Sequence, residues 1–322
     1  MHQGLNLLRG ISAFGIVGCH LMLSPVQVWG GAVTHFCDFN VALFAVMSGY
    51  LMLDKRCQNG GKESLKDWLI YVCKRAGRIL PIYVIWSVLF LLFTVIFDIL
   101  CDGGINLRFF DFRYWMEVFF CGSSSAHLWF LICLFYGQAI LKIADIFLVF
   151  MSSRGRELII FLCGLSMVVM SANFDGWFWR YPIRLFGFLF TGYALALSKI
   201  RIHPRILALN IVFLAGYHFW GKDMLPNYIR DWFLVIPVLL FFVKMEVSTK
   251  ALNFAILCGE TSMGVYLVHP LFTKIGGLLV RSVCDTPYGI VPVFIDWVLC
   301  WSFAVIATMI GLRFTIISRF IK

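Results

Sequence analysis

Long apolar stretches separated by short polar ones dominate this chain of 322 residues. Most of the apolar stretches are long enough for an α-helix to cross a lipid bilayer. The pattern predicts an all-α polytopic bundle of about ten membrane helices, forming a single domain over residues 1–322. The expected spans are residues 5–24, 38–53, 79–99, 127–149, 157–173, 182–198, 206–220, 230–245, 252–274 and 290–313.

Composition supports a membrane protein. Hydrophobic residues make up 61% of the chain and charged residues 14%, against about 45–50% and 25% in a typical soluble domain. No polar segment is long enough to form a separate soluble domain. The N-terminus lacks a basic region followed by a small-residue cleavage site, so we expect the first apolar stretch to remain as a membrane helix.

The distribution of Lys and Arg predicts the orientation. If the N-terminus is inside, 17 of these residues lie on the inner side and 8 on the outer side. The positive-inside rule then places both termini of a multi-pass protein in the cytoplasm. The net charge of +10 therefore reflects topology and contact with membrane lipids. We expect no nucleic acid partner, because no basic patch is interleaved with aromatic residues on a soluble surface.

The eleven cysteines are scattered and form no CxxC pair. No group of Cys and His residues has the spacing of a zinc site, so we expect no metal. In the predicted topology Cys37, Cys101, Cys121 and Cys284 lie outside the cytoplasm. Disulfides among these four stay an open alternative, because sequence alone does not determine pairing.

Two ionisable side chains lie inside the first apolar stretch. Arg9 and His20 are eleven residues apart, close to three helical turns, so both point to one helix face about 16 Å apart along the axis. Ionisable groups at membrane depth usually face a bundle interior and mark a functional site. We therefore take His20 and Arg9 as candidate catalytic residues. The structural alternative is that Arg9 extends to the headgroups and His20 packs between helices.

A basic cluster precedes the third predicted helix. Lys74, Arg75 and Arg78 are three and four residues apart, so their side chains converge on one side of a helical turn. Guanidinium groups form forked hydrogen bonds with phosphate, which suits the several phosphates of coenzyme A. Topology and anionic lipids also favour basic residues at this place, which is the structural alternative.

A third cluster lies on the outer side, before the fourth predicted helix. Serines at 123–125 are candidate N-caps, which would place His127 in the first helical turn. His127 and Trp129 are a candidate substrate-binding pair, because an aromatic face packs on a sugar ring while an imidazole bonds a hydroxyl. Glu117 is a candidate partner for His127 or for a substrate hydroxyl. The alternative for Trp129 is a place in the interfacial aromatic belt.

Six motifs follow one another along the chain. They are Arg9-Gly10 with His20, the run 43–51, Arg75 and Arg78 with Pro81 and Tyr83, the run 127–131, Gly187 with Gly192 and Tyr193, and Ser262 with Tyr266, His269 and Pro270. In this order and spacing the chain resembles the bacterial acyltransferase 3 family of integral membrane O-acyltransferases, many of which are surface-glycan O-acetyltransferases. The likeness covers about residues 5 to 275.

The resemblance implies a ten-helix core in the bacterial inner (cytoplasmic) membrane that uses cytoplasmic acyl-CoA, usually acetyl-CoA, to acylate a hydroxyl of a surface glycan. Arg9 and His20 match the first-helix residues that the family ties to activity. Arg75 and Arg78 match the pair that the family associates with the acyl donor. The second predicted helix departs from many members at Ala42 and Ala45, which leaves these assignments intact.

The expected reaction moves an acyl group, most simply acetyl, from acyl-CoA to a hydroxyl of a cell-surface or lipid-linked glycan. His20 would act as the general base, and Arg9 would hold the donor or tune the surroundings of His20. In a variant mechanism His20 takes the acyl group covalently. Direct transfer is favoured, because one histidine cannot easily serve as nucleophile and base at once.

Two other classes of function stay open. A transporter or flippase for a glycan or lipid-linked sugar would also bury polar groups along a path. The sequence shows no inverted repeat and no paired broken helices, which counts against a transporter. A non-catalytic scaffold or sensor would have no reason to place Arg9 and His20 on one buried helix face.

The remaining polar residues receive structural assignments. His269 precedes a proline near a helix end and is expected to pack or cap. The carboxylates expected to remain solvated near helix ends are those of Asp231, Glu260 and Asp296.

Overall fold

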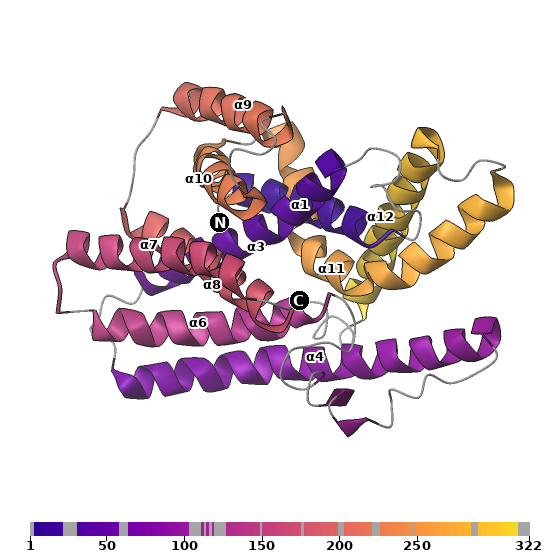
Figure 1. The fold of residues 1–322 in the computed structure, drawn as a ribbon, viewed down its shortest axis with the longest axis horizontal. Helices are drawn as coiled ribbons and strands as arrows, with labels where there is room; N and C mark the ends of the chain where they lie inside the picture. Colours follow the sequence, from indigo (N-terminus) through magenta and orange to yellow (C-terminus); the bar gives the residue numbers. More distant parts are fainter. Residues whose placement is uncertain are drawn as a thin grey trace. The chain divides into compact units, whose positions relative to one another are not determined.

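In the computed structural model the described part of the protein is a set of helices (Figure 1). The structure describes residues 3–21, 31–57, 64–102, 111, 112, 114, 115, 118, 127–148, 150–174, 177–198, 203–220, 226–246, 248–284 and 289–314. The regular secondary structure in these ranges is entirely helical, which confirms the predicted all-α class.

The described ranges hold ten long α-helices and one short 3-10 helix, and each predicted span overlaps one of the α-helices. The largest differences are the earlier start of α4 and the later end of α11. The α-helices are α1 (Gln3–Cys19), α3 (Gly31–Cys57), α4 (Leu65–Asp102), α6 (Trp129–Phe147), α7 (Ser153–Met170), α8 (Trp177–Ser198), α9 (Pro204–Trp220), α10 (Asn227–Lys244), α11 (Thr249–Val283) and α12 (Ile290–Arg313); the 3-10 helix is η2 (Ser171–Asn173).

Five of the described helices, α4, α6, α7, α11 and α12, contain segments long and apolar enough to cross a membrane. On α4 the exposed side chains of Val84, Val88, Leu92 and Ile96 are spaced four residues apart, so they form one apolar stripe. Soluble monomers rarely expose apolar surface of this extent. The chain is therefore a multi-pass membrane protein.

Helix α4 begins well before its predicted start at residue 79. The Ser64 backbone N–H and hydroxyl donate to the Asp67 carboxylate at 2.8 and 2.7 Å, and the Asp67 N–H donates to Ser64 Oγ at 3.3 Å. This reciprocal capping box gives partners to groups at the helix N-terminus. The 38 residues of α4 span about 57 Å, nearly twice the thickness of the hydrocarbon core of a bilayer.

The described contacts group the chain into two compact units. Unit 1 comprises Met1–Ser48 and Ile200–Lys322, and unit 2 comprises Gly49–Lys199. Helix α3 contributes to both, because the boundary falls within it.

In unit 1, α1 and α11 pack against each other in parallel. Near the middle of α1, Gly10 faces Cys258 of α11. Immediately after the end of α1, His20 faces His269, eleven residues further along α11. The chain therefore travels in the same direction along both helices.

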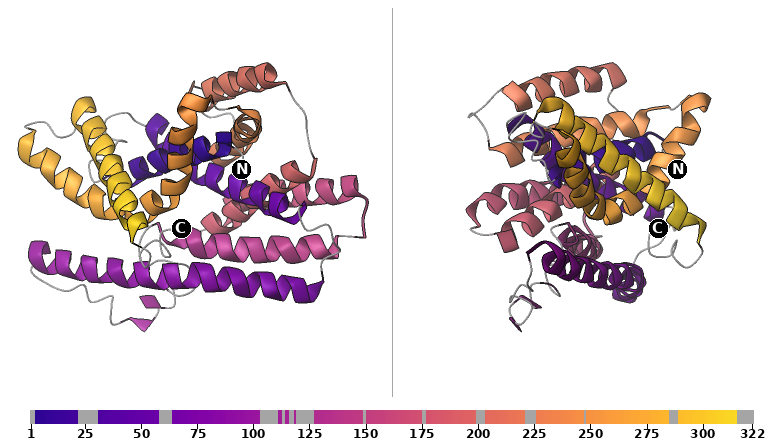
Figure 2. Two further views of the ribbon diagram at one scale, coloured as in Figure 1. Left: turned by 180° about the vertical axis from the view of Figure 1, so that it is seen from behind. Right: turned by 90° about the vertical axis from the view of Figure 1, so that its right-hand side faces the viewer.

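Helix α12 runs antiparallel to α11 and also packs on α1 (Figures 1 and 2). The ring of Trp297 stacks on Phe14 with centroids 5.0 Å apart, and its indole N–H donates to the Phe14 carbonyl oxygen at 2.8 Å. The Cys300 thiol donates to the carbonyl oxygen of Phe272 at 3.3 Å. These contacts tie α12 to both α1 and α11.

Unit 2 combines the last turns of α3 with α4, α6, α7 and α8. Helices α4 and α6 lie side by side (Figures 1 and 2). Helices α7 and α8 approach closely at two glycines, since a Cβ added to Gly164 would lie 2.9 Å from the Gly187 carbonyl oxygen. Small residues at such contacts let two backbones pack without intervening side chains.

A buried ion pair connects three helices of unit 2. Asp145 of α6 is fully buried, and its carboxylate lies 3.2 Å from Nε of Arg156 on α7. The Tyr193 hydroxyl of α8 donates to the other carboxylate oxygen at 2.6 Å. Arg156 is thus more than one of the charges that orient the chain, because it has a buried partner.

We expect Asp145→Asn to destabilise the folded protein, because it leaves the Arg156 charge without its partner. Breaking a buried pair costs about 3 kcal/mol, and the partial exposure of Arg156 places the expected loss at or below that figure. The double variant Asp145→Asn with Arg156→Met should recover part of the loss. Thermal unfolding in detergent measures both, and equal melting temperatures for wild type and Asp145→Asn would contradict a stabilising pair.

Candidate functional site

His20 lies at the C-terminal end of α1. The helix ends at Cys19 and not at residue 24 as expected, and the His20 backbone N–H donates to the Val17 carbonyl oxygen at 3.1 Å. Arg9 is half-buried within α1, and no carboxylate among the described residues pairs with it. The helix therefore presents His20 at its end and keeps the Arg9 cation about three turns away.

The structure brings a second histidine to His20. The His20 and His269 rings lie with centroids 5.1 Å apart and a tilt of 42°. His269 is fully buried within α11, and its Nδ1 lies 2.8 Å from the Tyr266 carbonyl oxygen and 3.1 Å from that of Val265. Sequence reasoning assigned His269 to packing or capping and did not connect it with His20.

The close packing of α1 on α11 places these rings. A Cβ added to Gly10 would lie 2.5 Å from the Cys258 Cβ. On α11, a Cβ added to Gly259 would lie 2.6 Å from Cγ of Asn6 on α1. Glycine on each helix therefore permits the approach that brings His269 to His20.

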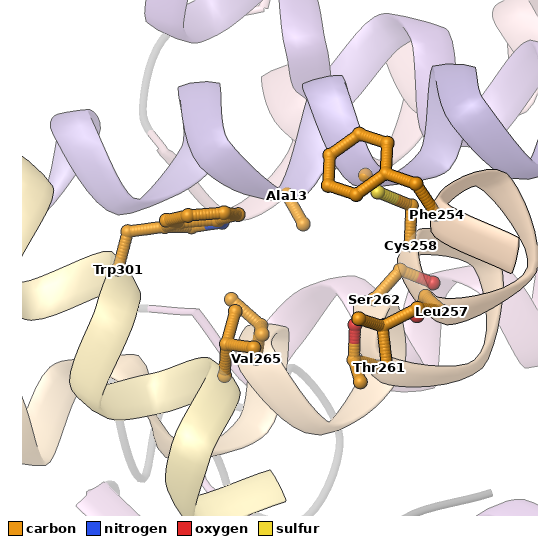
Figure 3. A pocket seen from close by; sticks show the side chains of 10 residues that line it. Ala13, Phe254, Leu257, Cys258, Thr261, Ser262, Val265 and Trp301 are labelled. Atoms are coloured by element: carbon orange, nitrogen blue, oxygen red, sulfur yellow. The ribbon is translucent and has the colours of Figure 1, made fainter. Parts of the chain in front are cut away.

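A cavity of about 30 Å³ lies between α1, α11 and α12 (Figure 3). Ala13, Val265 and Trp301 line it from the three helices. The hydroxyls of Thr261 and Ser262 donate to carbonyl oxygens of their own helix at 2.8 and 3.0 Å. Since both hydroxyl hydrogens are used, these side chains can only accept a hydrogen bond from a ligand in the otherwise mostly apolar cavity. The volume suits about two water molecules or a narrow chain.

The cavity belongs to the same helix seam as the histidine pair. Val265 lies four residues before His269 on α11, and Ala13 lies seven residues before His20 on α1. Both spacings return to nearly the same helix face. The cavity therefore lies one to two turns from the rings, toward the starts of α1 and α11.

The assignment of solvated carboxylates is correct for only one of the three residues. Glu260 is exposed, but Asp231 and Asp296 are buried. Sγ of Cys300 lies 3.2 Å from the Asp296 carboxylate, so its one hydrogen is shared between this oxygen and the Phe272 carbonyl oxygen. Hydropathy places residues near a helix end without showing which neighbouring helix covers them.

In unit 2, Lys74, Arg75 and Arg78 lie inside α4 and not before its first turn. Nε of Arg75 donates to the Tyr71 hydroxyl at 3.3 Å, and its guanidinium carbon lies 5.7 Å from the ring centroid. Nζ of Lys142, from α6, lies 5.3 Å from the same ring. Tyr71 therefore holds one cation from each helix, and Lys142 is a member of the basic cluster that sequence spacing missed.

The expected serine cap of the fourth helix is wrong. Helix α6 begins at Trp129, its N-cap residue is Leu128, and no side chain caps it. His127 lies in the preceding turn, is 3% exposed, and packs its ring edge-on against Phe90 at 4.8 Å. Glu117 and the serines at 123–125 lie outside the described residues.

Trp129 belongs to an aromatic and cationic cluster. Its ring lies 5.8 Å from that of Tyr181 on α8. The Arg184 guanidinium lies 5.6 Å from the Tyr181 centroid, and its Nε donates to Ser171 Oγ at 3.4 Å. Sequence reasoning missed Tyr181 and Arg184, because they are about fifty residues away from Trp129 along the chain.

One family model, described as an acyltransferase domain, matches residues 2–313. The chain belongs to the acyltransferase 3 family. No curated protein and no solved structure matches it. The family match confirms the resemblance drawn from the motifs and identifies the protein as a membrane acyltransferase. Such an enzyme requires an acyl donor and an acceptor.

The described residues of this acyltransferase contain no group of three His, Cys, Asp or Glu side chains placed to hold a metal ion. Cys284 is a free thiol. The other candidates for a disulfide, Cys37, Cys101 and Cys121, lie outside the residues whose side chains are described.

We expect Gly10→Ala to destabilise the acyltransferase, because the new Cβ would meet Cys258. Overpacking of this kind costs about 1–3 kcal/mol. Adding Cys258→Gly removes the opposing Cβ and should restore part of the stability. Gly77→Ala is the matched control, since an added Cβ there meets nothing within 4 Å. Thermal unfolding in detergent compares the four proteins. A melting temperature for Gly10→Ala equal to that of the Gly77→Ala control would exclude a tight α1–α11 contact.

Proposed function

We propose that this acyltransferase moves an acyl group, most simply acetyl, from cytoplasmic acyl-CoA to a hydroxyl of a cell-surface or lipid-linked glycan. The observation that carries the proposal is His20, held at the end of a membrane helix in a family of acyltransferases. An imidazole is the commonest side chain for moving a proton near neutral pH.

Direct transfer needs one proton acceptor. The acceptor hydroxyl oxygen attacks the thioester carbonyl carbon while His20 takes the hydroxyl proton. The resulting tetrahedral oxyanion collapses, the carbon–sulfur bond breaks, and the CoA thiolate takes the proton back from His20. The products are an ester and CoA thiol, and His20 returns to its neutral form. General-base help of this kind contributes about 10²–10⁴ in rate.

The position of His20 at the C-terminal end of α1 suits this role. Unpaired carbonyl groups give that end of a helix a partial negative charge. This charge stabilises the imidazolium that forms when His20 takes a proton. Arg9, three turns earlier on the same helix, is assigned to the donor or to the electrostatic surroundings of the reaction.

Lys74, Arg75 and Arg78 are assigned to the phosphates of the donor. Helix α4 is too long for the bilayer, so its first turns are available to a ligand in the cytoplasm if they project on that side. Lys142 adds a cation beside Arg75 through Tyr71. The three phosphates of the donor are negatively charged, and each Arg can donate two parallel hydrogen bonds to one of them.

The cavity between α1, α11 and α12 is assigned to the reactive end of the donor. It lies on the seam that leads from the start of α1 to His20. The hydroxyl oxygens of Thr261 and Ser262 can accept a hydrogen bond from an amide N–H of the pantetheine arm. A volume of about 30 Å³ is too small for a nucleotide and is close to that of an acetyl group.

The acceptor is assigned to the cluster around Trp129. His127 and Glu117 complete the sequence-based set, and the geometry adds Tyr181 and Arg184. The aromatic rings offer faces for a sugar, and the guanidinium offers donors for hydroxyl or carboxylate groups. Because His127 is buried against Phe90, we assign it to supporting the cluster and not to direct contact with the acceptor.

The family match spans both units, which supports one acyltransferase domain over residues 1–322. The Lys and Arg distribution supports both termini in the cytoplasm, and the likeness to a bacterial family supports a place in the bacterial inner membrane. A glycan or lipid-linked sugar transporter is the alternative function. The match to an acyltransferase domain favours catalysis, since a transporter consumes no acyl donor.

We expect His20→Ala to lower acyl transfer by at least about a hundredfold, because the reaction loses its base. Membrane vesicles would be given acetyl-CoA labelled in the acetyl group, and label in alkali-labile ester would be counted. His203→Ala, an exposed histidine of the same unit, is the control and should retain activity. Wild-type incorporation by His20→Ala would remove His20 from the reaction.

We expect Arg75→Ala with Arg78→Ala to weaken CoA binding about tenfold or more, because charge-assisted hydrogen bonds to phosphate are lost. Titration calorimetry of the purified protein with CoA measures the dissociation constant. Arg180→Ala removes another exposed arginine of the same unit and should leave the affinity unchanged. Equal affinity in the wild type and the double variant would place the donor elsewhere.

A further inference from the structure

We propose that His269 is a positioning residue for His20. In this arrangement the Nε2 atom of His269 accepts the N–H of His20, so that the second ring nitrogen of His20 presents its lone pair to the acceptor hydroxyl. The inference rests on the proposed role of His20 as the base. It assigns a catalytic-site function to a residue that the sequence analysis left to helix packing.

Pro270 explains why the ring of His269 is held. In a regular α-helix the backbone N–H of residue 270 would donate to the carbonyl oxygen of Tyr266. Proline has no N–H, so that carbonyl oxygen needs another donor. The Nδ1 atom of His269 lies 2.8 Å from it, and the carbonyl oxygen of Val265 lies 3.1 Å from the same nitrogen. The carbonyl oxygen that proline leaves without a backbone donor thus holds the neighbouring imidazole in place.

The anchor fixes the tautomer of the neutral ring. Both partners of Nδ1 are carbonyl oxygens, which only accept hydrogen bonds. Nδ1 must therefore carry the hydrogen, and Nε2 of the neutral His269 carries the lone pair. Because Nδ1 is turned to the backbone of α11, Nε2 lies on the other side of the ring.

His20 is close enough to use that lone pair. Its ring centroid is 5.1 Å from that of His269. At this separation the two rings are in contact, and a rotation of the His20 ring can bring one of its nitrogens to hydrogen-bond distance from Nε2 of His269. His269 is fully buried, so bulk water does not compete for its nitrogen. The parallel packing of α1 and α11 keeps both rings at this level.

Such a contact would orient the base without adding charge. A hydrogen bond from one nitrogen of His20 to His269 fixes which nitrogen of His20 is free to take a proton. The same bond strengthens when His20 becomes an imidazolium, because charged donors form stronger hydrogen bonds. The imidazolium is the species formed in the transfer step, so His269 would favour the reaction over the resting state.

Three variants separate positioning from packing. His269→Asn keeps an amide N–H that can reach the Tyr266 carbonyl oxygen, but it places no atom where Nε2 was. His269→Gln reaches that place and offers an oxygen acceptor. Pro270→Ala restores a backbone N–H to the Tyr266 carbonyl oxygen, which competes with Nδ1 while improving helix propensity.

The test is transfer of labelled acetyl from acetyl-CoA into alkali-labile ester by vesicles containing equal amounts of each protein. We expect His269→Asn to lower kcat at least about tenfold, with KM for acetyl-CoA within about twofold of wild type. His269→Gln should recover part of kcat, and Pro270→Ala should lower it while leaving the melting temperature equal to or above that of wild type.

Wild-type kcat in both His269→Asn and a well-folded Pro270→Ala would overturn the inference. The inference would also be overturned if His269→Asn and His269→Gln lost kcat equally and in proportion to the fall in their melting temperatures. His20→Ala distinguishes this failure from failure of the proposed function. If His20→Ala is inactive while the His269 and Pro270 variants behave as wild type, only the positioning role is wrong. If His20→Ala is active, the proposed base is wrong as well.

Discussion

The small side-chain volume of α1 is the constraint on which the candidate site depends. Gly10 meets Cys258 of α11, and the glycines at 15 and 18 meet side chains of α3 and α12. A larger residue at any of these points would push a neighbouring helix outward. Membrane helices gain little from hydrophobic burial against one another, so close backbone contact must supply much of their association. The place of His20 beside His269 follows from this contact.

Polar groups in the two units are satisfied in different ways. In unit 1 a proline frees a backbone carbonyl, and a histidine supplies the missing donor. In unit 2 the Asp145 carboxylate receives an arginine and a tyrosine. Both solutions follow from the high cost of leaving a polar group without a partner away from water. They differ in consequence, because the Asp145 carboxylate is held from two sides, whereas the His269 imidazole is anchored to its own helix through Nδ1 and turns its other ring nitrogen away from that backbone.

Hydropathy predicted the helical class and placed every span over a helix, because apolar length is a strong signal. It missed features that do not depend on apolar length. The early start of α4 is encoded by the Ser64 and Asp67 capping box, in a segment too polar to register as a span. His20 and Arg75 could be selected from the sequence, since ionisable residues are rare in apolar surroundings. His269, Lys142 and Tyr181 could not, because their importance comes from partners that are distant along the chain.

The parallel course of α1 and α11 restricts the membrane topology by parity. Two parallel helices that both cross a bilayer must start on the same side of it. The described chain from α1 to α10 contains eight α-helices, and an even number of crossings returns the chain to its starting side. If one of the eight did not cross, another part of the chain before α11 would have to compensate for it. Antiparallel α12 then brings the described chain back once more, so that it ends on the side where α1 began.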